Sequence, residues 1–114
     1  MEWREQRVGE NESRFRVVNE RIRDLVIDDA ERHGEHAEGL SVLCECADVD
    51  CTEKITVSLS TYEWIRSAPA RFIVVPGHDV PDSERVLREG NGYVIVEKFG
   101  DARAAASELD PRTN

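Results

Sequence analysis

Apolar residues in the first third of the chain follow the spacing of an α-helix. They recur at intervals of three and four residues and would share one face: Phe15, Val18, Ile22, Leu25 and Val26. Asn11 and Ser13 are both suitable N-caps, and Gly34 is a suitable terminator. We therefore expect an amphipathic helix over residues 11–30, preceded by a flexible N-terminal tail over residues 1–10.

Val17 and Ile27 widen the apolar stripe of this helix. A stripe of this width has two interpretations, because either two core elements or a second copy of the chain can cover it. Core packing is the simpler of the two. Helix 11–30 is therefore also the surface predicted to meet a protein partner or to form a homodimer.

Short apolar stretches in the remaining chain predict strands, and residues 55–59 alternate apolar and polar residues, which is typical of a strand with one solvated face. Five strands are predicted, over residues 40–44, 55–59, 72–75, 84–89 and 93–96. The stretch 84–89 has a helical turn as its alternative. Gly90-Asn91-Gly92 predicts a hairpin between the last two strands.

Short helices complete the predicted fold. They are expected over residues 60–67 and 102–109. The first would begin with a capping box formed by Ser60 and Glu63. The order of elements indicates a single small α+β domain over residues 11–109, with a largely antiparallel sheet of about five strands. A frayed C-terminus is expected over residues 110–114.

Charge and hydropathy narrow the expected partners. The chain has 114 residues, of which 24 are acidic and 15 are basic, and its net charge is −9. This charge repels phosphate, so we expect no nucleic-acid partner. The longest apolar runs, at 72–75 and 93–96, are too short to cross a membrane. The N-terminus lacks the apolar segment of a secretory signal, which predicts a cytoplasmic location.

Three cysteines lie close together at the connection between two predicted strands, at Cys44, Cys46 and Cys51. An odd number cannot pair off completely in disulfides, and the predicted compartment keeps thiols reduced. A turn can aim the three sulfurs at one point, and three thiolates with one imidazole are a common ligand set for structural zinc. Acidic residues around the turn also favour a cation: Glu45, Asp48, Asp50 and Glu53. The alternative is a group of partly buried thiols without a metal.

A histidine is the expected fourth ligand. His78 follows Pro76-Gly77 at the end of a predicted strand, where a tight turn would fix the direction of its ring. His33 and His36 lie on a polar connector that constrains them less. We favour His78 and keep His36 as the alternative. The predicted ligands of one structural zinc per chain are Cys44, Cys46, Cys51 and His78.

The spacing Cys-x-Cys-x4-Cys is similar to the zinc-binding tail that follows the catalytic domain of SET-type methyltransferases. That tail takes its fourth cysteine from the catalytic domain, and nothing in this chain resembles such a domain. The similarity covers only the cysteine segment and implies no activity.

The chain more closely resembles small uncharacterised bacterial proteins with a Cys-Glu-Cys segment, a short helix containing Tyr, a strand ending in Pro-Gly-His and a terminal Val-Glu-Lys strand. The matching residues here are Cys44-Glu45-Cys46, Tyr62, Phe72 to His78, and Val96-Glu97-Lys98. The resemblance covers residues 40–98 and implies no named activity. It implies that the three cysteines and His78 form one site.

The predicted function is binding. None of the cysteines begins a predicted helix, and the neighbouring carboxylates oppose thiolate formation, which disfavours a catalytic cysteine. Four protein ligands would close the zinc site, and closed sites are structural. We therefore predict a protein-interaction or regulatory module that uses its acidic surface or helix 11–30. A metal-assisted hydrolase or a thiol redox enzyme built on the same cluster is the alternative.

Overall fold

The computed structural model describes the backbone of residues 3–48 and 50–112 and the side chains of residues 10–48 and 50–112. The elements are α1 (Trp3–Arg32), β1 (Gly39–Leu43), β2 (Lys54–Ser58), α2 (Leu59–Arg66), β3 (Arg71–Val74), β4 (Glu84–Gly90), β5 (Tyr93–Lys98) and α3 (Asp101–Glu108). The predicted order of elements and the α+β class are confirmed. Among the described residues, no helix is long and apolar enough to cross a membrane.

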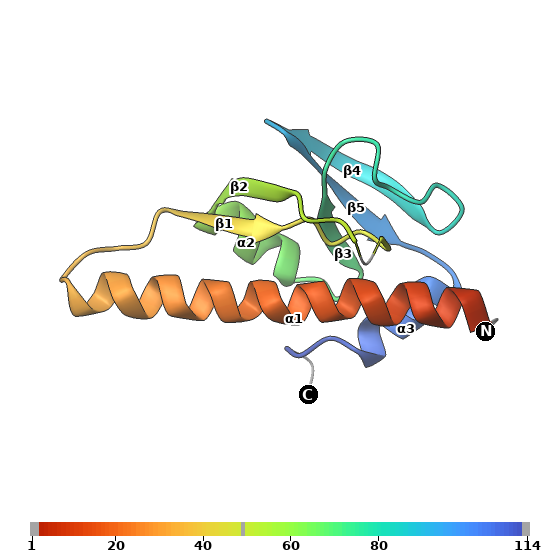
Figure 1. Cartoon of the computed structure of the whole chain (residues 1–114), viewed down its shortest axis with the longest axis horizontal. Coiled ribbons are helices and arrows are strands. Elements are labelled where there is room, and N and C mark those ends of the chain that lie inside the picture. The colour runs from red at the N-terminus through yellow and green to blue at the C-terminus, as the bar shows by residue number, and fades with distance from the viewer. Residues whose placement is uncertain (1–2, 49, 113–114) are drawn as a thin grey trace.

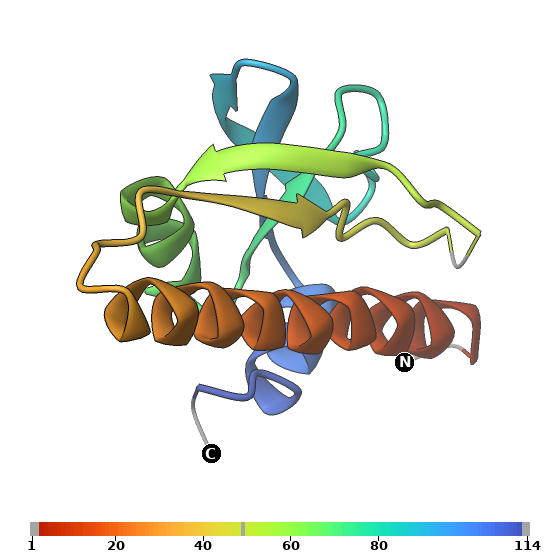
Figure 2. The same ribbon diagram turned by 60° about the vertical axis from the view of Figure 1, so that its left-hand side comes forward.

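The strands form two antiparallel sheets. β1 and β2 make a hairpin, whereas β5 lies between β3 and β4 in the second sheet. Both sheets lie on one side of α1, and α3 lies on the other side (Figures 1 and 2). The β4–β5 turn falls at Asn91-Gly92, as predicted, and Gly92 has a φ of +84°, a conformation that glycine adopts without strain.

The hydrophobic core lies where the two sheets meet α2. β1 and β2 alternate buried and exposed residues, as expected for strands with one solvated face. β3 and β5 are buried on both faces at their centres, with Ile73 and Ile95 fully enclosed. Tyr62 and Ile65 of α2 complete this core.

α1 is longer than predicted. It begins at Trp3 and not at Asn11, so the part of the expected tail that the structure describes, residues 3–10, is helical. These residues include Arg, Glu and Gln, which favour helices, and no proline; Gly9 costs about 1 kcal/mol but does not end a helix. Residues 1–2 of the expected tail lie outside the described residues.

The prediction of the buried face of α1 was wrong. Among the side chains of this helix that the structure describes, residues 10–32, the buried ones are polar: Glu12, Ser13, Arg16 and Asn19. In the predicted apolar stripe, Val18 is 40% exposed and Leu25 is 51% exposed, while Phe15 and Ile22 are half-buried and Val26 packs against the core. Hydrophobic spacing misses such a face, because polar side chains can be buried wherever each finds a hydrogen-bond partner.

Hydrogen bonds from these polar side chains attach α1 to the rest of the fold. Arg16 donates from Nη1 to the carbonyl of Pro69 at 2.6 Å and from Nη2 to the carbonyl of Ala106 at 2.8 Å. Lys98 of β5 donates from Nζ to Glu12 at 2.6 Å. Successive turns of α1 are therefore bonded to different parts of the chain.

α2 begins at Leu59, one position before its predicted start, and it has a different cap. The Ser58 hydroxyl accepts a hydrogen bond from the Thr61 N–H at 3.1 Å. Ser58 thus ends β2 and also caps α2, and the predicted capping box of Ser60 and Glu63 was wrong. Glu63 instead accepts from Arg23 at 2.7 Å.

The C-terminal residues that the structure describes are held by ion pairs. α3 lies close to its predicted bounds. After it, the expected frayed end contains a buried residue, Asp110, which pairs with the buried guanidinium of Arg66. Arg112 pairs with Glu20 of α1 and Glu63 of α2. Residues 113–114 of the expected frayed end lie outside the described residues.

Candidate metal centre

The connection between β1 and β2 carries all three cysteines. Cys44 follows the last residue of β1, and its N–H donates to the carbonyl of Glu53 at 3.0 Å, which extends the hairpin by one pair. The Cys51 N–H donates to the carbonyl of Asp48 at 3.0 Å, and the Asp48 carboxylate accepts from the Asp50 N–H at 2.9 Å. These bonds reverse the chain and return Cys51 to the side of Cys44.

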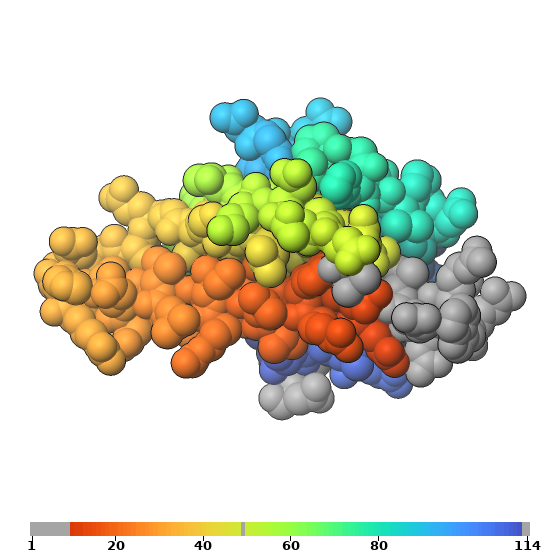
Figure 3. Space-filling view, viewed as in Figure 1, coloured from red at the N-terminus to blue at the C-terminus, as the bar shows by residue number. Residues whose placement is uncertain are grey.

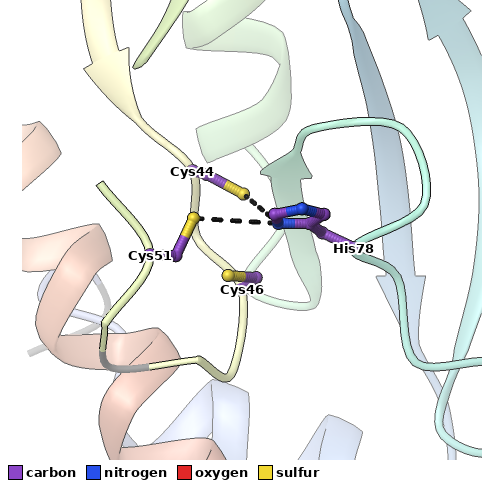
Figure 4. A group of neighbouring side chains, drawn as sticks. All are labelled: Cys44, Cys46, Cys51 and His78. Carbon is purple, nitrogen blue, oxygen red and sulfur yellow. Dashed lines mark hydrogen bonds between the residues drawn. The ribbon is translucent and has the colours of Figure 1, made fainter. Parts of the chain in front are cut away.

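The side chains of the Cys-Glu-Cys segment point in alternate directions, as in an extended strand. Cys44 and Cys46 face the same point (Figure 4), whereas the carboxylate of Glu45 is bonded to Asn19 of α1 at 2.8 Å and to the Ile73 N–H at 3.1 Å. The Glu45 N–H also donates to the carbonyl of Ile73 at 2.8 Å. The two cysteines are therefore aimed by a segment that is anchored on its opposite side.

His78 lies on the turn that follows β3. Its N–H donates to the carbonyl of Val75 at 2.9 Å, which closes a four-residue turn. Pro76 and Gly77 occupy the central positions, and Gly77 has a φ of +88°, as a type II turn requires. The Pro-Gly pair thus fixes the direction of the His78 ring, as predicted.

The four predicted ligands converge on one point, with one donor atom from each residue (Figure 4). These atoms all lie within 4.8 Å of one another. The His78 Nδ1 is 3.7 Å from the Sγ of Cys44 and 3.7 Å from the Sγ of Cys51. In a tetrahedral zinc site, bond lengths of about 2.3 Å to sulfur and about 2.0 Å to nitrogen imply a separation of about 3.5 Å. The cluster therefore has the dimensions of a small four-coordinate metal site.

The cluster lies at the edge of the core, with one buried side and one solvated side. Cys44 and Cys46 are buried, whereas Cys51 and His78 are partly exposed. Burial raises the pKa of the Cys44 thiol, although the Val75 N–H donates to its sulfur at 3.2 Å, and burial also raises the pKa of Cys46. A metal must displace these protons, so its affinity will rise with pH.

The other histidines are not part of the cluster. Among the described residues, the group that can hold a metal contains His78 and neither His33 nor His36. His36 precedes β1 and the cysteines follow it, so the length of the strand lies between them. His33 is exposed, and its Nδ1 lies 2.8 Å from the carbonyl of Asp29.

The expected ring of acidic residues around the cysteines is only partly present. Asp48, Asp50 and Glu53 are exposed on the hairpin connection. Glu45 is fully buried and faces away from the sulfurs, so its predicted contribution to a cation site was wrong. The cause is the alternation of the extended segment, which sends every second side chain to the opposite face.

Asn19 is the supporting residue that sequence reasoning missed. Its amide donates to the carbonyl of Leu43 at 2.9 Å and to Glu45 at 2.8 Å, and its oxygen accepts from the Leu43 N–H at 2.8 Å. An Asn in the middle of a helix is a weak signal, because most such residues face solvent. Its role emerges only once α1 is placed beside β1.

Comparisons with protein-family models, curated proteins and solved structures find no match for this chain. The resemblance to small bacterial proteins with a Cys-Glu-Cys segment therefore stays a prediction. The geometry of the cluster is the evidence on which its function rests.

Proposed function

We propose that this protein binds one structural zinc ion through Cys44, Cys46, Cys51 and His78. The observation that carries this proposal is the convergence of four donor atoms from two separate loops to within 4.8 Å of one another. Free thiols are not required to gather around an imidazole in order to pack as small apolar groups. Binding of one metal ion by all four residues explains why the three thiols lie around His78.

The donor set favours zinc over other metals. Three thiolates and one imidazole are soft or borderline ligands, which suit Zn²⁺ and not the oxygen-seeking Mg²⁺ or Ca²⁺. Zn²⁺ also accepts a tetrahedral arrangement readily, since its filled d shell imposes no geometry of its own. The sulfur–nitrogen distances of 3.7 Å fit that arrangement with little movement.

A structural role fits the place of the cluster in the fold. Four protein donors complete a tetrahedron and leave no open position for a substrate or for a reactive water. The ion would join the β1–β2 hairpin to the turn after β3, and so it would cross-link the two sheets. The raised pKa of the Cys44 and Cys46 thiols also disfavours a redox enzyme, because such enzymes need a thiolate at neutral pH.

The biological role that we propose for this zinc-stabilised domain is a protein-interaction or regulatory module. The chain carries a net charge of −9, and its exposed apolar residues on α1 offer a surface for a partner. A hydrolase would need an open zinc position. If cobalt replaces the zinc, a closed site will keep its absorption spectrum unchanged when a hydroxamate or azide is added.

A competition titration with a chromophoric chelator tests the ligand set. We expect one zinc per chain in the unmodified protein. Replacement of His78 by alanine should weaken binding by more than the roughly 10–100-fold typical of changes outside the first shell of ligands. His36→Ala is the matched control, because His36 is an exposed histidine outside the cluster, and it should leave the affinity unchanged. Full affinity in the His78→Ala variant would refute the proposed ligand set.

A further inference from the structure

α1 has an apolar stripe on its outward side. Val18 is 40% exposed and Leu25 is 51% exposed, and the half-buried Phe15 and Ile22 lie between and beside them. The four residues are spaced by three, four and three positions, so they form one continuous line along the helix. This line will be called the α1 stripe.

The stripe is not needed for the core of its own chain. The side chains of α1 that are fully buried include Arg16 and Asn19, and they attach the helix through hydrogen bonds. A space-filling view shows one side of α1 lying open along the molecule, with no other described element over it (Figure 3). An exposed apolar line on a helix whose buried face is polar indicates a binding surface.

The exposed charges on α1 select the partner. Along the part of the helix that carries the α1 stripe, the exposed Arg14 and Arg21 come before the exposed Asp24 and Asp28. Arg14, Arg21 and Asp28 are separated by seven positions each, so they follow one edge of the α1 stripe. The basic end of this edge is complementary to the acidic end of a second copy running in the opposite direction. In such a pair Arg14 faces Asp28 of the second copy twice, whereas Arg21 faces Arg21 once at the two-fold axis, and Asp28 also pairs with Arg32 of its own chain.

We propose that two copies of this chain associate through the α1 stripe as an antiparallel helix pair. In this arrangement Phe15 packs near Leu25 of the second copy, Val18 packs near its Ile22, and Arg14 lies near its Asp28. The contact is two-fold symmetric, so each favourable pair occurs twice. Four apolar side chains per copy make a small interface, which gives a weak dimer that depends on concentration. The proposal is independent of the zinc site, because the stripe and the candidate ligands share no residue.

Sedimentation equilibrium of the full chain tests the stripe. We expect a reversible monomer–dimer equilibrium in the unmodified protein. Leu25→Glu should weaken it by about a hundred-fold, because the symmetric contact carries the change twice and buries two charges. Val17→Glu is the matched control: Val17 is 50% exposed on the same helix but lies about 100° around it from Val18, outside the stripe. Both changes are at exposed positions and should leave the melting temperature nearly unaltered.

Charge reversal tests the orientation. Arg14→Asp and Asp28→Arg should each weaken the dimer, and the double variant should restore it, since the two residues face each other only in the antiparallel pair. A chain that stays monomeric at every concentration, or a dimer that Leu25→Glu leaves intact, would overturn the proposed interface. A double variant no stronger than the single variants would overturn the antiparallel arrangement.

Discussion

Asn19 connects α1 to the segment that carries two of the candidate ligands. Its side chain makes two hydrogen bonds with the backbone of Leu43, at the edge of β1 that faces away from β2, and a third with Glu45. An Asn side chain has both a donor and an acceptor in one plane, so it can make the pair of hydrogen bonds that the backbone of a neighbouring strand would make. Cys44 and Cys46 are thus positioned by a residue that is not one of the four candidate ligands.

Removal of the Asn19 side chain should therefore weaken both the fold and the site. Asn19→Ala leaves the backbone groups of Leu43 and the carboxylate of Glu45 buried without these partners, and we expect a loss of about 3 kcal/mol of unfolding free energy. Zinc affinity should fall by about ten-fold, as for other residues that orient ligands. Denaturant unfolding and chelator competition measure the two effects. Val17→Ala, an exposed change on the same helix and outside the α1 stripe, should alter neither.

At the scale of elements, α1 shows why a correct helix can be predicted with the wrong face inward. The spacing of Phe15, Val18 and Ile22 correctly indicates a helix, but spacing cannot tell whether an apolar line meets the core or the solvent. The buried line instead contains Glu12, Arg16 and Asn19, whose partners are distant in sequence. The buried faces of β1 and β2 were easier to predict than that of α1. In these strands the apolar residues alternate with polar ones, and the apolar residues are the buried ones.

The site was predictable for local reasons. Close spacing brings the cysteines together on one hairpin connection, and a Pro-Gly turn fixes the ring of His78. The supporting contacts were not predictable, since the partners of Glu45 come from α1 and β3. The sequence pattern alone gives little indication of residues whose role depends on partners that are distant along the chain.

The cap of α2 can be assigned by a pair of serine substitutions. Ser58→Ala should lower the unfolding free energy by about 1 kcal/mol, because it removes the acceptor for the Thr61 N–H. Ser60→Ala should have a smaller effect, although Ser60 is the cap that the sequence suggests. Thermal denaturation of both variants checks this. A larger loss of unfolding free energy for Ser60→Ala would show that Ser60, and not Ser58, is the N-cap of α2.

Two buried carboxyl groups on different elements share one ammonium group. Lys98 of β5 pairs with Glu12 of α1 and with Glu84 of β4. Burial is the main cause that raises the pKa of Glu12, from 4.5 to about 8. The folded protein therefore binds this proton more tightly than the unfolded chain does, and stability from the protonated form is lost as the pH rises through 8.

Glu12→Gln should remove this pH dependence. We expect the unfolding free energy of the unmodified protein to fall relative to that of the variant between about pH 5 and pH 8, by up to about 1.4 kcal/mol per pH unit. Denaturant unfolding at a series of pH values gives the difference directly. Parallel curves for the two proteins would show that Glu12 does not hold this proton.

At the scale of the whole molecule, the candidate zinc site lies where the two sheets meet. The principal dimensions are 48 × 30 × 24 Å, and the long axis is that of α1. The β1–β2 hairpin contacts the second sheet next to the cysteines, where the Glu45 N–H donates a hydrogen bond to the carbonyl of Ile73. A metal bound there would reinforce the contact between parts of the chain that fold as separate sheets.

Zinc removal should therefore loosen one region before the rest. When free zinc exceeds its dissociation constant by about a thousand-fold, binding contributes about 4 kcal/mol to stability, and a chelator should remove that contribution. Hydrogen exchange should increase first at the amides of Cys44, Cys51 and Val75, while the amides of β5 stay protected. Uniform exchange across the fold after chelation would contradict this cross-linking role.

The central claim is that one zinc ion is held by three sulfurs and one nitrogen. X-ray absorption spectroscopy at the zinc edge, on protein loaded with one equivalent of zinc, measures this most directly. We expect about three sulfur neighbours at about 2.3 Å and one imidazole nitrogen at about 2.0 Å. A first shell made only of oxygen and nitrogen, or a protein that retains no zinc, would contradict the claim.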